Sequence, residues 1–284
     1  MKKILVIIAL LCLMVRGVYA AGRFYLHQSS SAPSATANEG ALYVRESDEV
    51  AFDTFTKLLL HCDGTDGSTT FTDSATSKTV TANGNAQLDT AVYKFGTAAG
   101  LFDGNGDYLS LADSDDWCLG SGNFTIDFWV RFNSTGSSSI LEQYVDNSHY
   151  WSLYVYDNAL RFAQDTGSGA DSWNAVGWSV TTNTWYHIAV VRYLNDFMFF
   201  LNGTRIGDYV DVTGKSIANI SSTLRIGYQQ RNNFYLNGTI DELRISKGKA
   251  RWTYNFNVPN SPYAPSNRVN LYFKDSAGTE YKLN

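Results

Sequence analysis

The amino-acid sequence predicts an all-β protein, an antiparallel two-sheet sandwich with extended short-strand flanks. Aromatic residues make up 14% of the 284 residues, and 23 glycines accompany only 4 prolines, a balance that favours strands joined by tight turns. From Lys57 to about Ser246, short apolar–polar alternations follow one another between turn residues, at the spacing typical of a sandwich. Beyond the N-terminal segment, no stretch keeps the 3.6-residue period of a helix.

Residues 1–20 have the features of a secretory signal peptide. Lys2 and Lys3 precede an apolar run from Ile4 to Val15, and Val18-Tyr19-Ala20 is typical of a cleavage site. The alternative is an uncleaved membrane anchor, but the run is shorter than the roughly 20 residues that span a bilayer. We therefore expect a secreted or cell-surface protein that contacts the membrane only through this segment before cleavage.

The charge balance argues against nucleic acid as a partner. The chain has 22 Lys and Arg residues against 27 Asp and Glu residues, and cleavage would remove three of the basic ones. No basic run or basic–aromatic stripe remains to follow a phosphate backbone.

Residues 21–56 predict a polar arm with a short strand at 41–44, and residues 264–284 predict a second short β segment. Leu42 and Val44 alternate with a tyrosine, as do Leu271 and Phe273. Each segment is too short to be stable alone. They could pair within one chain, or between chains by strand addition, which would give self-assembly. We favour pairing within the chain, because an inserted domain commonly has its ends close together.

Residues 57–263 contain the strands of the predicted sandwich. In Phe124 to Phe132, Thr125, Asp127 and Arg131 fall on one face, and the other face carries Phe124, Ile126, Phe128, Val130 and Phe132. Trp185 to Tyr193 is a second strand, in which we interpret His187 as a packing residue. Asn202-Gly203 between apolar runs predicts a hairpin.

Two polar, aromatic segments, Asp165 to Trp178 and Tyr228 to Tyr235, interrupt the strands and predict loops. Loops at the ends of a sandwich are common recognition surfaces. Aromatic rings with neighbouring amides and guanidinium groups are suited to sugars, although a core would use the same rings. The candidate ligand-binding residues in and beside these loops are Tyr144, Trp173, Trp178, Tyr228, Gln229, Arg231, Asn232 and Tyr235.

Several short segments, in order along the chain, resemble the laminin-G-like, concanavalin A-like lectin/glucanase superfamily. Three of them are Leu58 to Gly64, Ala99 to Leu109 and Gly238 to Ile245, with the central strands and the Leu201-Asn202-Gly203 hairpin between them. The resemblance covers about Lys57 to Tyr263 and implies a jelly-roll sandwich. Its phage-type members carry a similar tail after the domain, and the two flanks resemble halves of a short β repeat of virion fibre and tail proteins.

The sequence lacks the catalytic pattern of the superfamily's glucanases. That pattern is E-x-D-x-x-E, which places two carboxylates on one strand face. Asp241 and Glu242 are adjacent, so a regular strand would point them to opposite faces. We therefore expect no enzyme activity, with a glycoside hydrolase as the less favoured alternative.

The resemblance also implies a structural Ca²⁺ where the first strand of the domain meets the last. By position its ligands would be Asp63 and Asp241, with Asp73 as a third. The alternative is that these aspartates cap turns.

Two cysteines lie outside the signal segment, Cys62 and Cys118. An even pair in an exported protein predicts a disulfide, and both positions depart from the superfamily's usual residues. Two free thiols are the alternative.

Two functions fit these observations. The first is an exported, non-catalytic glycan-binding or adhesion module whose partner is a glycan or surface polysaccharide. The second is a structural component of a surface fibre, pilus or virion, in which the sandwich is a decoration and the flanks assemble. A lectin does not need residues 21–56 or 264–284, whereas a polymer does.

Overall fold

The computed structural model describes residues 27–28, 41–45, 51–167, 169–174, 178–265, 270–274 and 280–283. The chain divides into two compact units, residues 1–47 with 267–284, and residues 48–266. The predicted signal peptide lies outside the described residues. Within the described ranges, no helix is long and apolar enough to cross a membrane.

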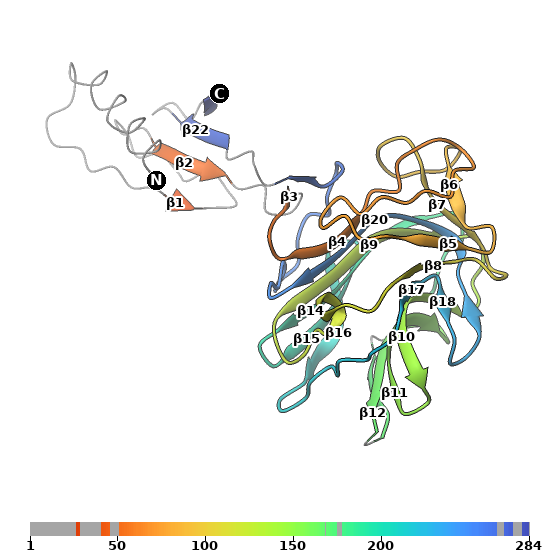
Figure 1. The fold of residues 1–284 in the computed structure, drawn as a ribbon. Coiled ribbons are helices and arrows are strands. Elements are labelled where there is room, and N and C mark those ends of the chain that lie inside the picture. Colours follow the sequence, from red (N-terminus) through yellow and green to blue (C-terminus); the bar gives the residue numbers. More distant parts are fainter. Residues whose placement is uncertain are drawn as a thin grey trace, which may run out of the picture. The chain divides into compact units, whose positions relative to one another are not determined.

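The first unit contains a four-stranded sheet made from both flanks of the chain (Figure 1). Its order is β1 (His27–Gln28), β2 (Ala41–Arg45), β22 (Asn270–Lys274) and β23 (Glu280–Leu283). Strands β2 and β22 are antiparallel, with Leu42 opposite Phe273 and Val44 opposite Leu271. The two flanks therefore pair within the chain, as the sequence analysis favoured.

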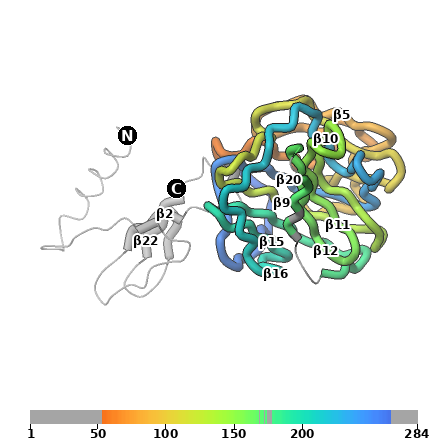
Figure 2. The backbone as a smooth tube through the Cα atoms, turned by 90° about the horizontal axis from the view of Figure 1, so that it is seen from below, coloured from red at the N-terminus to blue at the C-terminus, as the bar shows by residue number. Residues whose placement is uncertain are grey.

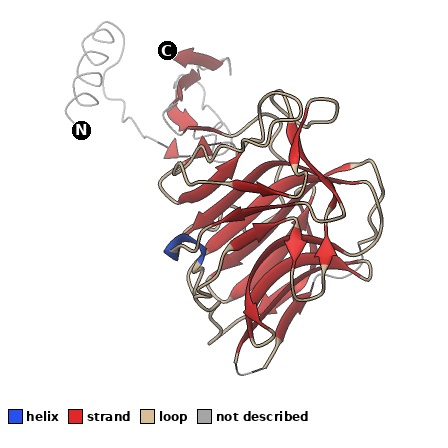
Figure 3. Cartoon of the chain, turned by 45° about the vertical axis from the view of Figure 1, so that its right-hand side comes forward, coloured by secondary structure: helices blue, strands red, loops and turns tan. Residues whose placement is uncertain are grey.

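The second unit is a sandwich of two antiparallel sheets (Figure 3). The seven-stranded sheet has the order β13 (Asp171–Asn174), β12 (Ala159–Thr166), β11 (His149–Tyr156), β10 (Ser138–Asp146), β17 (Leu224–Ile226), β8 (Tyr108–Leu111), β5 (Thr81–Asn83). The eight-stranded sheet has the order β16 (Thr204–Asp211), β15 (Asp196–Leu201), β14 (Trp185–Tyr193), β9 (Phe124–Phe132), β20 (Asn237–Lys247), β7 (Ala99–Asp103), β6 (Gln87–Asp89), with β4 (Thr56–Leu60) also paired to β20.

One hydrophobic core fills the space between the two sheets. Five apolar side chains at alternate positions of β9 enter it as their alternation predicts: Phe124, Ile126, Phe128, Val130 and Phe132. The opposite face of β9 is also buried, because Thr125 and Asp127 have no exposed surface. A local alternation cannot reveal this second covering layer, since it comes from a distant part of the chain.

The covering layer is the segment 248–263, which follows β20 and which we call the strap. Trp252 and Phe256 of the strap stack with their ring centroids 4.0 Å apart. Both pack on a group of buried side chains that faces away from the main core, Ala189, Val191, Met198 and Phe200.

A buried polar network lies beneath the strap. Arg244 Nε donates to Asp127 Oδ1 at 3.0 Å, and the Tyr263 hydroxyl donates to Asp127 Oδ2. Burial alone would raise the pKa of Asp127, but Arg244 and then His187 outweigh it and lower that pKa to about 2. His187 is fully buried in β14, so its interpretation as a packing residue is confirmed.

The two ends of the sandwich unit lie side by side. Strand β3 (Ala51–Phe52) pairs in parallel with β21 (Ala264–Pro265), and β4 pairs with β20. In Figure 2 the first and last parts of the unit, orange and blue, accordingly run beside each other. The compact unit begins at Asp48 and so includes residues 48–56, which the sequence analysis assigned to the arm.

Candidate ligand-binding site

A short hairpin turns over the outer face of the seven-stranded sheet, the face directed away from the core. It consists of β18 (Tyr228–Gln229) and β19 (Phe234–Tyr235), inside the segment predicted as a polar loop. Gly227 makes the reversal from β17: its φ is +90°, and a Cβ there would lie 2.9 Å from the ring of Phe102.

The sheet beneath this hairpin carries tyrosines on its outer face. On β11, Trp151, Leu153 and Val155 enter the core, so Tyr150 and Tyr154 between them face outward. Tyr150 and Tyr154 form a separate buried cluster with Ala163 of β12, and Tyr144 and Phe234 pack against it. Since Phe234 belongs to β19, the hairpin rests directly on the tyrosines of the sheet.

Polar contacts anchor the hairpin to the sheet. The backbone N–H of Gln230 donates to Glu142 Oε2 at 2.6 Å, and Gln229 Nε2 donates to Ser152 Oγ at 2.9 Å. Asn232 Nδ2 donates to Gln229 Oε1, also at 2.9 Å. Gln229 has no exposed surface. Its side chain therefore positions the hairpin and is not itself available to a ligand, which corrects its assignment as a ligand-binding residue.

Stacked aromatic rings form the exposed part of the site. Phe234 stacks on Tyr156 with centroids 5.7 Å apart and an interplanar angle of 13°, and Tyr156 is 46% exposed. Tyr228 stacks on Tyr235 at 4.3 Å. The Arg231 guanidinium lies 4.3 Å from the centroid of the Tyr150 ring. The site thus offers flat apolar surfaces beside guanidinium donors.

Several polar atoms of this region are buried and have no hydrogen-bond partner in the described part of the chain. They are Glu142 Oε1, the Tyr150 hydroxyl and Arg225 Nη1. Burial raises the pKa of Glu142 to about 7, although the N–H of Gln230 and the charge of Arg225 act in the opposite direction. Burial, then the hydrogen bond with Tyr235, raises the pKa of Tyr228 to about 12.

The structure brings six of the eight predicted ligand-binding residues to this hairpin and the β10 strand below it. These six are Tyr144, Tyr228, Gln229, Arg231, Asn232 and Tyr235. The sequence analysis missed Tyr150, Tyr154, Tyr156 and Phe234. Tyrosines at alternate positions in the β11 sequence HYWSLYVY were the signal that could have found the first three.

The structure corrects the assignment of Trp173 and Trp178 as ligand-binding residues. Both are core residues, 1% and 5% exposed. Trp173 lies on β13 and packs on Phe162 and Phe197, with centroids 5.4 and 4.6 Å away. The polar composition of the surrounding segment predicted a loop, but its tryptophans fill space between the sheets.

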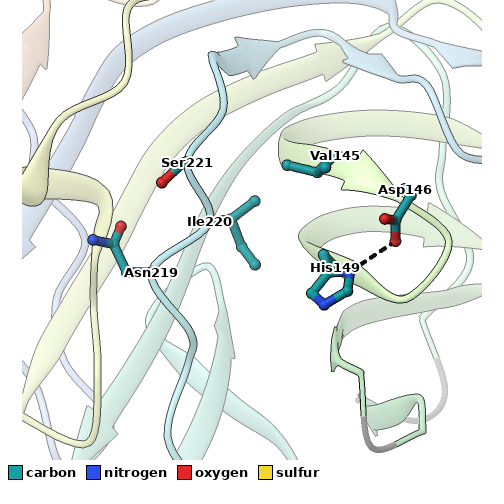
Figure 4. A pocket seen from close by; sticks show the side chains of 6 residues that line it. All are labelled: Val145, Asp146, His149, Asn219, Ile220 and Ser221. Carbon is teal, nitrogen blue, oxygen red and sulfur yellow. Dashed lines mark hydrogen bonds and ion pairs between the residues drawn. The ribbon is translucent and has the colours of Figure 1, made fainter.

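A shallow hollow of about 320 Å³ lies beside the β10–β11 turn (Figure 4). It is lined by Val145, Asp146, His149, Asn219, Ile220 and Ser221. His149 Nδ1 lies 2.9 Å from Asp146 Oδ1, an exposed pair at one side of the hollow. The Tyr144 carbonyl accepts from Ser222 Oγ, so the hollow adjoins the tyrosine end of β10.

Asp241 and Glu242 do not point to opposite faces of β20 as a regular strand would require. A bulge between Asp241 and Arg244, with Glu242 at a φ of +50°, places both between the core residues Ile240 and Leu243. Both carboxylates therefore lie on the outer face. Glu242 Oε1 pairs with His61 Nδ1 at 2.7 Å.

The predicted calcium ligands separate into two groups. Asp241 Oδ2 accepts the N–H groups of Lys94 and Phe95, while its Oδ1 is buried without a partner. Burial, helped by Glu242 and Asp63, raises the pKa of Asp241 to about 7. An unpartnered acceptor near Asp63 fits a cation.

Asp73 does not fit a cation. Its oxygens accept from Leu59 N, Ala75 N, Thr76 N and Oγ1, and Lys78 N, so it caps its own turn. Among the described residues, no three His, Cys, Asp or Glu side chains are arranged to hold a metal ion. Any Ca²⁺ at Asp63 and Asp241 would therefore also need carbonyl or water oxygens.

The predicted disulfide is not formed. Cys62 and Cys118 are both free thiols. Cys62 is buried in the core, with its Sγ 3.9 Å from the carbonyl oxygen of Leu60. Cys118 instead follows the 3₁₀ helix Asp115–Trp117 as its C-cap. The even number of cysteines outside the signal segment predicted a disulfide, but the fold places the two cysteine side chains in different environments.

Comparison with known proteins agrees with the all-β sandwich fold. The model of the concanavalin A-like lectin/glucanases superfamily matches residues 103–251. The binding domain of Paraclostridial Mosquitocidal Protein 1 is similar with a TM-score of 0.56 and 15% identity, over 70% of this chain and 50% of that chain.

Two botulinum neurotoxin structures are also similar. One is of type C, whose cell entry depends upon interaction with two ganglioside molecules (TM-score 0.52, 18% identity, 69% of this chain and 48% of that chain). The other is the neurotoxin DC binding domain in complex with SialylT (TM-score 0.51, 18% identity, 70% and 49%). The present chain matches about half of the length of these structures, and no curated protein matches it. The family match covers more than half of the chain, and the chain belongs to the concanavalin A-like lectin/glucanase superfamily.

Proposed function

We propose that this protein is an exported, non-catalytic glycan-binding module whose site is the hairpin β18–β19 with the tyrosine face beneath it. The observation that carries the proposal is the exposed Tyr156 ring, stacked on Phe234 and accompanied by the guanidinium of Arg161. A sugar can lay its apolar face on such a ring and direct its hydroxyls to neighbouring polar groups. Sites of this kind combine aromatic surface with a few placed polar groups.

The similar toxin structures support a glycan as the ligand class. One of those toxins depends on gangliosides for cell entry. Their low identity to this chain shows a shared fold, so the argument for the ligand rests on the site's own residues.

The arrangement of carboxylates supports a binding role without catalysis. The bulge of β20 places Asp241 and Glu242 on one face, but both are buried, at 0% and 1% exposure. The N–H of Tyr263, at the end of the strap, donates to Glu242. A glycosidic bond would need to reach between two carboxyl groups, and no such approach is open here.

A glycan array with matched variants tests the site. Tyr156→Ala is expected to lose glycan binding because it removes the exposed stacking surface. Tyr209→Ala is the control, since Tyr209 is equally exposed, at 45%, but lies on β16 of the other sheet. Equal loss in both variants, or none in Tyr156→Ala, would contradict this location.

A structural role in a surface fibre, pilus or virion is the second candidate function. It is favoured by the four-stranded sheet that both flanks build outside the sandwich. Analytical ultracentrifugation separates the two functions. A fibre component should form a higher-order species that disappears when residues 21–50 are removed, whereas a monomer at every concentration would leave the glycan-binding module as the function.

Export is part of the proposal and has a direct test. N-terminal sequencing of the protein recovered from outside the cell should begin at Ala21 or Gly22, as expected for signal-peptide cleavage. A chain that retains Met1 and stays with the membrane would show an uncleaved anchor instead.

A further inference from the structure

Arginine side chains gather at the candidate site of an otherwise acidic protein. Arg225 on β17 is the direct cross-strand neighbour of Glu142 on β10, and both face outward. Arg231 lies in the hairpin over Tyr150, and Arg161 on β12 lies 5.5 Å from the Tyr156 ring centroid. These cations come from three elements, and two of them, Arg231 and Arg161, lie against tyrosine rings of the outer face.

Arg231 has the geometry of a preorganised anion receptor. Its guanidinium rests on the ring face of Tyr150, and among the described residues it makes no hydrogen bond or ion pair with a protein acceptor. Stacking holds a guanidinium in a plane and leaves its N–H edges for a ligand. A planar fork of donors matches a carboxylate bidentately.

Among the described residues, no nearby carboxyl group forms an ion pair with the Arg231 guanidinium. Asp165 Oδ1 accepts the N–H groups of Gly167 and Gly169. Glu142 Oε2 accepts the N–H of Gln230, and burial raises the pKa of Glu142 to about 7. At pH 6 the Glu142 carboxyl therefore carries less negative charge than a free glutamate and offsets less of the positive charge of Arg225 and Arg231.

We propose that the site selects glycans that carry a carboxylate, such as a uronic acid or a sialic acid. Arg231 binds the carboxylate while the sugar ring lies on the Tyr156–Phe234 stack. The two parts are continuous, because Phe234 packs on the cluster that contains Tyr150, the ring beneath Arg231. This inference rests on the proposed glycan-binding function and adds the chemical class of the ligand.

Isothermal titration calorimetry with two matched ligand pairs tests the inference. One pair is an oligosaccharide containing glucuronic acid and its carboxyl-reduced form. The other is sialyllactose and lactose, so that the two pairs distinguish the two sources of carboxylate. At pH 6, at least one carboxylate-bearing ligand should bind on the order of tenfold more tightly than its neutral partner, as a charge-assisted bidentate contact predicts.

Arginine variants locate the preference. Arg231→Gln should remove it, and Arg231→Lys should keep only part of it, because lysine retains the charge but lacks the planar fork. Arg205→Gln is the matched control, since Arg205 stacks on Tyr209 at 3.7 Å in the other sheet. Thermal melts confirm that each variant folds.

The pH dependence gives an independent readout. Glu142 is faced by Arg225 from β17, Arg231 from the hairpin, Tyr150 from β11 and Tyr228 from β18. Its ionisation above pH 7 places a negative charge beside the arginines, so the preference should weaken at pH 8. In Glu142→Gln the preference should be the same at both values of pH.

The outcomes separate this inference from the proposed function. Equal affinity for the acidic and neutral members of both pairs, or a preference that survives Arg231→Gln, overturns the inference alone. If neither member of either pair binds and a wider glycan array is also negative, the proposed function fails and the inference fails with it.

Discussion

Buried carboxyl groups in the sandwich have pKa values displaced in opposite directions because their neighbours differ. Burial disfavours the charge of each, but Asp127 faces Arg244 and keeps a pKa of about 2. Among the residues that the structure describes, Glu142 and Asp241 have no ion-pair partner of that kind, and their pKa values rise to about 7. Near neutral pH, folding therefore keeps Glu142 and Asp241 partly protonated, whereas both carboxyl groups would be ionised in the unfolded chain.

Glu142→Gln should make the protein more stable than wild type at pH 8. The folded pKa of about 7 lies above the ordinary glutamate pKa of 4.5, so the contribution of Glu142 is fully present below about pH 4.5 and is lost as the pH rises towards 7. The difference in unfolding free energy should reach on the order of 2–3 kcal/mol. Urea unfolding of both proteins at pH 5 and pH 8 measures it, and a difference independent of pH would contradict the assignment.

Chelation should lower the melting temperature if Ca²⁺ binds at Asp63 and Asp241. Asp241→Asn should remove most of that sensitivity because Asp241 offers the unpartnered buried oxygen. Asp73→Asn is the control: it weakens a turn cap but should leave the chelator effect unchanged. Identical wild-type melting curves with and without chelator would count decisively against the ion.

At the scale of elements, the strap explains most of what the sequence did not predict. The alternation of Phe124 to Phe132 correctly predicted the core face of β9, since that face depends on local pattern. The burial of Asp127 depends on Tyr263, more than a hundred residues later, and no local period reports such a contact. For the same reason the bulge at Glu242 escaped prediction, because it appears only in the pairing of β20 with β9.

The candidate site was predictable in composition but not in placement. The polar and aromatic composition of the Tyr228 to Tyr235 segment predicted a recognition loop, and this segment forms the hairpin of the site. Trp173 and Trp178 carried the same compositional signal yet are buried. Composition does not distinguish a ring that binds a ligand from a ring that fills a core; only the packing of the two sheets does.

Tyr263→Phe tests how much the strap contributes to stability. Loss of the hydroxyl leaves Asp127 with fewer donors in a fully buried site, and the cost should be about 1–3 kcal/mol of unfolding free energy. Tyr254→Phe, at a strap position that is 77% exposed, should change stability by less than about 0.5 kcal/mol. Urea denaturation of the two variants measures both, and equal effects would show that the buried network adds nothing.

At the scale of the whole molecule, the sandwich is inserted between the two halves of another sheet. Its ends meet where β3 pairs with β21, and the neighbouring strands β2 and β22 pair in the flanking sheet. Residues 48–266 contain both large sheets and the core between them, so this unit should fold alone.

The excised unit 48–266 is expected to melt cooperatively within a few degrees of the full chain. Circular dichroism of both proteins makes the comparison. Tyr263→Phe should lower the melting temperature by the same amount in both if the strap is intact in the excised unit. A non-cooperative melt of the excised unit would show that the sandwich depends on the flanks.

The pairing of β2 with β22 also imposes an order on folding. The partners Arg45 and Asn270 are more than two hundred residues apart in the chain. Closing a flexible loop of that length costs about 5 kcal/mol in chain entropy, more than so few strand pairs are expected to return. Once the sandwich has formed, β3 and β21 already hold the two chain ends together, and only short connections remain to be closed. The flanking sheet is therefore a late structure: it cannot form before β22 and β23 have been synthesised, and we expect it to form only after the sandwich between its strands has folded.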